Sequence, residues 1–135
     1  MAEKQSVPRN MARLEKIVAA LPESHRVDVE AWDDEPTFRV RNKNFLFTNK
    51  QGTRLGLKLS KEEAEAVVAG DDRVEPMGYG LGRHGWIGVH LPARSGAERW
   101  EEVTEWIRTS YTLVAPKKLA QHVLDEDAAA LAAGK

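Results

Sequence analysis

The chain has 135 residues, of which 41% are hydrophobic and 30% are charged, and this composition is typical of a single globular domain. The net charge of -1 argues against nucleic-acid binding driven by overall charge and leaves open a local basic patch. The absence of cysteine excludes disulfide scaffolds, thiolate catalysis and cysteine-based metal sites. We expect one domain over residues 1–135, with a core over about 8–124 and frayed ends at 1–6 and 127–135.

The first predicted element is a helix over residues 8–21. Met11, Leu14, Val18 and Leu21 recur at helical spacing, so one face of this helix is apolar. Ser6 is its expected N-cap, and Pro22 ends it.

A block of strands follows, in which apolar and polar residues alternate. Strands are expected over residues 26–32, 37–43, 45–48 and 53–59, with turns at 33–36, 42–44 and 49–52. In the last three strands we expect a continuous antiparallel meander, with Phe38, Val40, Leu55 and Leu57 facing helices.

Two capping boxes predict the next helices. The first, at residues 60–63, opens a helix to about residue 69. A short edge strand over 74–77, a glycine-rich loop over 78–85 and a strand over 86–91 come next. The second box, at 95–98, opens a helix to about residue 109. Residues 110–114 are expected to link it to a last helix that begins near Pro116 and continues as an alanine-rich tail, either helical or frayed.

This order of elements predicts an α+β fold. The sequence runs through one helix, three or four strands, a helix, one or two strands and two helices. Because consecutive strands are joined by short turns, we expect a curved antiparallel sheet with helices packed on one face.

No catalytic, cofactor-binding or metal-binding constellation is visible in the sequence. Residues 80–85 match the G-x-G-x-x-G pattern, but a strand follows the motif where a dinucleotide site needs a helix. The histidines lack metal-ligand spacing, and no nucleophile–base pair can be recognised. We therefore expect a protein that is not an enzyme. No apolar run approaches the length of a membrane span and the first residues do not form a signal peptide, so we expect a cytoplasmic protein with no membrane partner.

The charge distribution is the most informative feature. Between residues 37 and 61 there are seven basic residues and no acidic residue. If the apolar side chains of these strands are buried, five basic residues share the outer face of the sheet: Arg39, Arg41, Lys43, Arg54 and Lys58. DNA or another polyanion is the partner that such a face predicts. The alternative interpretation is an ordinary solvated sheet face, partly neutralised by Asp28 and Glu30.

Several segments together resemble the MmcQ/YjbR family of small bacterial proteins. They are Trp32, residues 35–40, 43–45, 57–59, 78–82, 85–87 and 100–103, Ser110 with Tyr111, and residues 116–119. The resemblance spans residues 8–120. It implies a frataxin-like (CyaY-like) or secretion-chaperone-like fold and a DNA-binding role through a double-wing arrangement, and it supplies no catalytic residues.

Two functional hypotheses follow. The first is a non-enzymatic module that binds DNA or another polyanion through the basic sheet face, as a monomer or weak dimer. The second is a protein-interaction adaptor or small-ligand binder that uses a cleft near the 78–85 loop, where Tyr79, Trp86 and Tyr111 would line a pocket.

Overall fold

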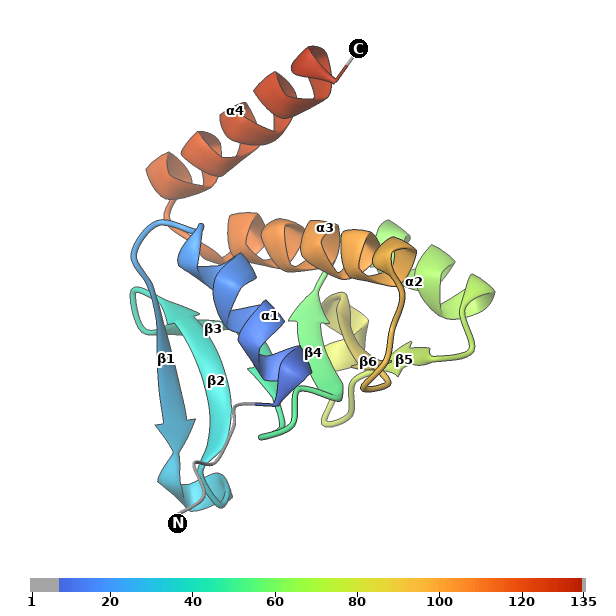
Figure 1. The fold of residues 1–135 in the computed structure, drawn as a ribbon. Helices are drawn as coiled ribbons and strands as arrows, with labels where there is room; N and C mark the ends of the chain where they lie inside the picture. The colour runs from blue at the N-terminus through green and yellow to red at the C-terminus, as the bar shows by residue number, and fades with distance from the viewer. Residues whose placement is uncertain (1–7, 135) are drawn as a thin grey trace.

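The computed structural model describes residues 8–134, which form one antiparallel sheet with helices on one face (Figure 1). In these residues the sheet has six strands in the order β1-β2-β3-β4-β6-β5. The strands are β1 (Ser24–Val29), β2 (Glu35–Val40), β3 (Lys43–Thr48), β4 (Arg54–Lys58), β5 (Val74–Pro76) and β6 (Trp86–His90). The helices are α1 (Arg9–Ala19), α2 (Lys61–Gly70), α3 (Ala97–Val114) and α4 (Lys117–Ala133). This architecture confirms the predicted α+β fold and its element order.

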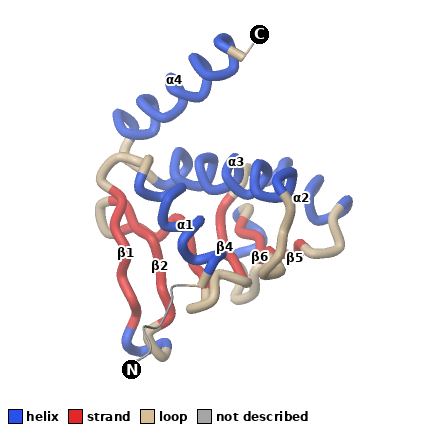
Figure 2. The backbone as a smooth tube through the Cα atoms, viewed as in Figure 1, coloured by secondary structure: helices blue, strands red, loops and turns tan. Residues whose placement is uncertain are grey.

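The helices lie on one side of the strands, as the tube in Figure 2 shows. α3 packs on β3 and β4, α1 contacts β1 and α3, and α2 contacts β5 and β6. Phe38, Val40, Leu55 and Leu57 are each at most 3% exposed and belong to the core between sheet and helices, as predicted. α4 packs against α3 and extends away from the body of the molecule (Figure 1). The opposite side of the sheet, which none of the four helices of residues 8–134 covers, is called the outer face below.

The hairpin between β2 and β3 differs from the prediction by one residue, and this changes which side chains share a face. The turn consists of Arg41 and Asn42, both with positive φ (50° and 69°), and Val40 pairs with Lys43. A two-residue hairpin turn whose backbone follows the twist of the strands requires positive φ at both central residues, which asparagine tolerates well. Lys43 is therefore the first strand residue rather than part of the turn.

The strand β1 begins earlier and ends earlier than expected. It covers Ser24–Val29, and the residues Glu30–Trp32 form a turn of 3-10 helix. Asp33 and Asp34 then adopt positive φ and reverse the chain into β2. Trp32 thus leaves the strand and lies beyond its end.

One half of the first predicted capping box is confirmed. The amide of Glu63 donates to the Ser60 hydroxyl over 3.1 Å at the start of α2. The box at Ser95 is wrong: Gly96 is the N-cap residue of α3, and the Ser95 hydroxyl donates to the carbonyl oxygen of Pro92 instead. Because α3 begins one residue later than predicted, the Ser95 side chain lies outside its first turn.

The ends of the helices bring three further differences. The expected cap Ser6 lies outside the described residues, and Pro8 occupies the N-cap position of α1. Residues 110–114, expected to form a link, continue α3 because Ser110 and Tyr111 are buried against the sheet. Residues 127–133, expected to fray, are the last turns of α4, in accordance with the high helix propensity of alanine.

Candidate nucleic-acid interface

An aromatic strip crosses the outer face. Phe47 of β3 lies between Trp32 and Trp86 of β6, with ring centroids 6.1 Å and 5.5 Å away. Trp32 is half exposed, and the other two rings are partly exposed. Phe47 pairs across the sheet with Gly56, and Gly56 pairs with Gly88, so β4 and β6 present no side chain at these two positions. Each of the three aromatic residues is therefore at least partly accessible to solvent on this face.

A side chain at position 56 would displace a close neighbour on this face. A Cβ atom built on Gly56 would lie 2.8 Å from the sulfur of Met77 and 3.4 Å from the Cβ of Phe47. The Met77 side chain therefore occupies the space above β4 and extends the apolar strip toward β5.

Three of the five predicted basic residues lie on the outer face. Arg39 pairs with His25 on β1, Arg54 pairs with His90 on β6, and Lys58 pairs with Trp86. Because directly opposed residues of an antiparallel pair share a face, these three side chains lie on the side of Phe47 and Trp86. Arg54 is exposed, whereas Arg39 and Lys58 are partly exposed.

The other two basic residues do not share that face. Lys43 is exposed and pairs with Val40, whose side chain lies in the core, so Lys43 is directed to the helix side of the hairpin. Arg41 lies in the turn, where its guanidinium forms an ion pair with Glu23. Hydrogen bonding from Arg41 lowers the pKa of Glu23, and Glu23 in turn raises the pKa of Arg41. The five-residue face is thus corrected to Arg39, Arg54 and Lys58.

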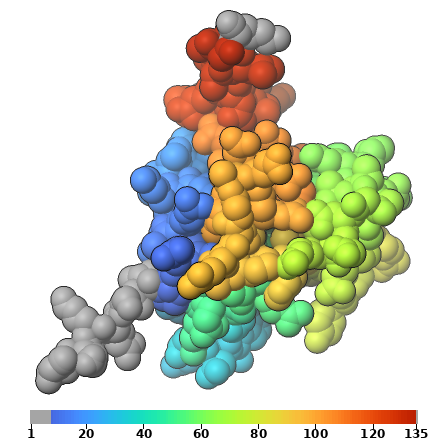
Figure 3. All heavy atoms as spheres, turned by 45° about the vertical axis from the view of Figure 1, so that its right-hand side comes forward, coloured from blue at the N-terminus to red at the C-terminus, as the bar shows by residue number. Residues whose placement is uncertain are grey.

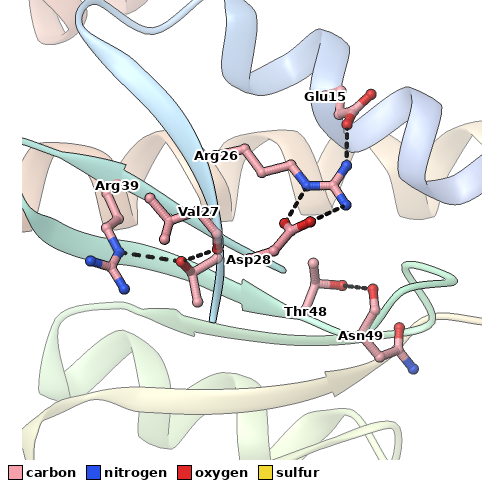
Figure 4. A network of polar contacts seen from close by, with 8 residues as sticks. Glu15, Arg26, Val27, Asp28, Arg39, Thr48 and Asn49 are labelled. Atoms are coloured by element: carbon pink, nitrogen blue, oxygen red, sulfur yellow. Dashed lines mark hydrogen bonds and ion pairs between the residues drawn. The ribbon is translucent and has the colours of Figure 1, made fainter. Parts of the chain in front are cut away.

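Arg39 is held by a residue of its own strand, which in turn bonds to the neighbouring strand β1, as Figure 4 shows. Its Nε donates to the hydroxyl of Thr37 over 3.3 Å, and that hydroxyl donates to the carbonyl oxygen of Val27 over 2.7 Å. This bond uses one of the five N–H donors of the guanidinium. The remaining donors lie on the outer face.

Asp28 does not neutralise the outer face. It accepts hydrogen bonds from Arg26, which also pairs with Glu15 of α1 (Figure 4). Asp28 raises the pKa of Arg26 by this hydrogen bond. Since Arg26 pairs in register with the core residue Phe38, the whole network lies on the helix side of the sheet.

Lys58 is held by a residue of α3 that the sequence interpretation did not select for this purpose. The backbone amide of Lys58 donates to the hydroxyl of Ser110 over 2.9 Å, and that hydroxyl donates to the carbonyl oxygen of Phe45 over 2.6 Å. The fully buried Ser110 thus bridges β3 and β4 where their pairing ends. The sequence does contain a signal for this role of Ser110: it is a polar residue on the apolar face of α3, in line with Val103, Trp106 and Ile107.

Tyr79, Trp86 and Tyr111 do not line a common pocket. Tyr79 is fully exposed, and Trp86 lies on the outer face. Tyr111 is buried on the helix side, where its ring meets Phe45 edge-on at 5.3 Å and its hydroxyl donates to the carbonyl oxygen of Pro22 over 2.7 Å. Burial raises the pKa of Tyr111.

The glycine-rich loop has a structural explanation. Gly80 and Gly85 adopt positive φ of 79° and 93° around a turn of 3-10 helix, Leu81–His84. A Cβ on Gly85 would overlap the carbonyl oxygen of Leu59, whose amide donates to the Gly85 carbonyl over 2.9 Å. The loop therefore connects β5 to β6 and packs against the end of β4, rather than forming a phosphate-binding turn before a helix.

Within residues 8–134 no three His, Asp or Glu side chains are grouped so that they could hold a metal ion. In the same residues no helix is long and apolar enough to cross a membrane.

An open antiparallel sheet with helices on one face defines an α+β protein, and in this chain the opposite face carries aromatic and basic residues. The model of the YjbR family matches residues 19–113, and the chain belongs to this family. It is also similar to a Deinococcus radiodurans protein whose crystal structure is assigned to the domain family DUF419. The sequences are 26% identical, the match covers 82% of this chain and 81% of that chain, and the TM-score is 0.62. No curated protein matches the chain.

Proposed function

We propose that this protein is a non-enzymatic binding module that holds single-stranded nucleic acid on the outer face of its sheet. The observation that carries the proposal is the aromatic strip of Trp32, Phe47 and Trp86 between the basic residues Arg39, Arg54 and Lys58. Aromatic rings on a sheet stack with unpaired bases, and flanking cations contact the phosphates.

The spacing of the charges suits an extended strand. Arg39 and Lys58 are separated by β3, so their backbones are roughly 10 Å apart, and Arg54 lies roughly 13 Å from Lys58 along β4. Three phosphate contacts predict that log K falls with log[salt] with a slope of about -2 for single strands. The overall charge of -1 gives no further attraction, so affinity depends on the face itself.

The preference for single strands comes from the partly exposed rings. Bases in a duplex are stacked on one another and cannot present their faces to Phe47 or Trp86. We therefore expect an oligothymidine to bind more tightly than a duplex of equal length.

Fluorescence anisotropy with a labelled oligothymidine at several salt concentrations tests the proposal. Replacing Arg39, Arg54 and Lys58 together by Gln should abolish binding, and Trp32→Ala should weaken it by about tenfold, the loss expected for one stacked base. The matched control removes three charges elsewhere, with Gln at Lys43, Lys117 and Lys118, and should retain most of the affinity. No binding by the unmodified protein at low salt, or equal losses in the two triple variants, would refute the proposal.

The alternative of a small-ligand or adaptor site beside the 78–85 loop has less support. A hollow there, of about 210 Å³, lies between α2 and β5 and is lined by Ala64, Val68, Pro76 and Gly82 among others. Its volume is below the roughly 300 Å³ at which small-molecule sites begin.

A further inference from the structure

A second group of basic residues lies on the helix side of the molecule. Arg9 and Arg13 are four residues apart on α1, and Arg94 precedes α3. Together with Ala93, Ser95 and Trp100 they line a hollow of about 380 Å³. No carboxylate lines this hollow, so its charge is positive.

The three arginines of this hollow form no ion pair within the described chain, in contrast to four other arginines. Four arginines in residues 8–134 form ion pairs within the chain: Arg26, Arg41, Arg99 and Arg108. Arg9, Arg13 and Arg94 form none with the described carboxylates, so their guanidinium groups keep their charge and donors for a ligand. Paired donors of this kind match the oxygens of a phosphate.

Arg13 is held in place by an aromatic ring. Its guanidinium carbon lies 5.1 Å from the centroid of Trp100, and Trp100 is 7% exposed. A cation stacked on a packed indole loses less side-chain freedom when an anion binds than a free surface arginine does. The Arg13 side chain, which forms one side of the hollow, is therefore already ordered before a ligand binds.

The hollow opens into a larger groove between α1 and α3, which lie side by side on the face seen in Figure 3. Arg13 and Trp100 line both spaces. The groove has a volume of about 750 Å³, and its remaining lining residues are Lys16, Ile17, Ala97, Glu101, Thr104 and Glu105. This volume lies within the range of roughly 300–1,000 Å³ found for small-molecule sites, and the lining combines apolar and polar groups.

We propose that this composite site binds a small organic phosphate. The phosphate lies in the hollow, where Arg9, Arg13 and Arg94 donate hydrogen bonds, and the body of the molecule lies in the groove against Ile17, Trp100 and Thr104. The site is separate from the outer face, because α1 and α3 cover the opposite side of the sheet (Figure 1).

Calorimetric titration with pyrophosphate tests the phosphate part of the proposal. The unmodified protein should bind pyrophosphate, and Arg9→Gln combined with Arg94→Gln should raise Kd at least tenfold. Both replaced side chains are exposed, so the fold should be kept. Arg13→Lys, which keeps the charge and loses the planar fork, should also weaken binding.

The control is Arg54→Gln with Lys58→Gln on the outer face, which should leave the Kd for pyrophosphate unchanged. This double variant also separates the two proposals, since it should weaken the binding of the oligothymidine and leave the binding of pyrophosphate unchanged. Absence of pyrophosphate binding, tighter binding of citrate, or an equal loss in the control would overturn the inference.

Nuclear magnetic resonance tests the groove. Pyrophosphate should shift the Trp100 indole and residues 93–97, and leave the Trp86 indole unmoved. Among ADP, glucose 6-phosphate and phosphoserine, at least one should bind more tightly than pyrophosphate and also shift Ile17 and Thr104. If none does, the assignment of the groove to the body of the ligand is wrong.

Discussion

The hydroxyl of Ser110 is the contact whose removal most directly tests how the outer face is built. It accepts from the amide of Lys58 and donates to the carbonyl of Phe45, and no other group in the described chain replaces it there. Ser110→Ala leaves one buried and one partly buried backbone group without a partner. An unsatisfied buried group costs about 1–3 kcal/mol, so we expect the free energy of unfolding to fall by about 2–3 kcal/mol.

Urea unfolding followed by circular dichroism measures this loss. With a slope of about 1–3 kcal/mol per molar urea for small proteins, the midpoint should fall by roughly 1–2 M. Ser95→Ala is the matched control, because the Ser95 hydroxyl donates to one loop carbonyl outside the sheet, and it should cost less than about 1 kcal/mol. In the Ser110 variant, hydrogen exchange of the Lys58 amide should accelerate more than that of the Leu57 amide.

A loss no larger than that of the control would refute the reasoning. It would mean that the Lys58 amide and the Phe45 carbonyl find other partners once the hydroxyl is gone, and that the bridge through Ser110 is not needed.

Two other predictions concern stability. Gly85→Ala should lower the free energy of unfolding by more than about 3 kcal/mol, because the new Cβ overlaps the backbone of Leu59 and alanine is strained at positive φ. Gly70→Ala is the control and should cost little, because a Cβ there has nothing within 4 Å. Thermal unfolding compares the two variants, and equal melting temperatures would contradict the argument. Asp71→Asn should cost about 1 kcal/mol at neutral pH, because a hydrogen bond from Arg99 lowers the pKa of Asp71. Since the folded pKa is the lower one, this stabilisation is complete above the ordinary value of 3.8 and is lost as the pH falls through the folded pKa. The difference in stability between the two proteins should therefore narrow as the pH falls below 3.8, and a difference that stays constant would contradict the assignment.

The fold could be predicted from local patterns because its strands alternate and its turns are short. The spacing of Leu55 and Leu57, two residues apart, predicted that one face of β4 lies in the core, and both residues are buried there. The turn at Arg41 could not be predicted, because an arginine with positive φ is uncommon and the neighbouring asparagines offered another turn. Because the turn includes Arg41, Lys43 pairs with Val40 and its side chain lies on the helix side of the sheet.

The candidate site was predicted only in part, because its geometry depends on contacts between distant segments. The basic residues were visible as a block, but the aromatic strip joins Trp32, Phe47 and Trp86 across three elements. The bond from Ser110 to the Phe45 carbonyl spans 65 positions of the chain, and no local pattern predicts such a partner. Asn10 was missed for the same reason: its amide donates to the carbonyl oxygens of Gly52, 42 residues away, and of Leu91, 81 residues away.

The strand order also has a consequence for how the chain is assembled. β6 comes last of the strands in the sequence, yet it lies between β4 and β5, so neither neighbour can complete its pairing before residue 90 has been added. A nascent chain that ends before β6 already holds the β1-to-β4 meander, whose β4 edge carries Leu55 and Leu57 with unpaired backbone groups. Such an edge invites pairing with another chain. Synthesis from β4 to β6 is therefore the interval in which this protein is most exposed to aggregation.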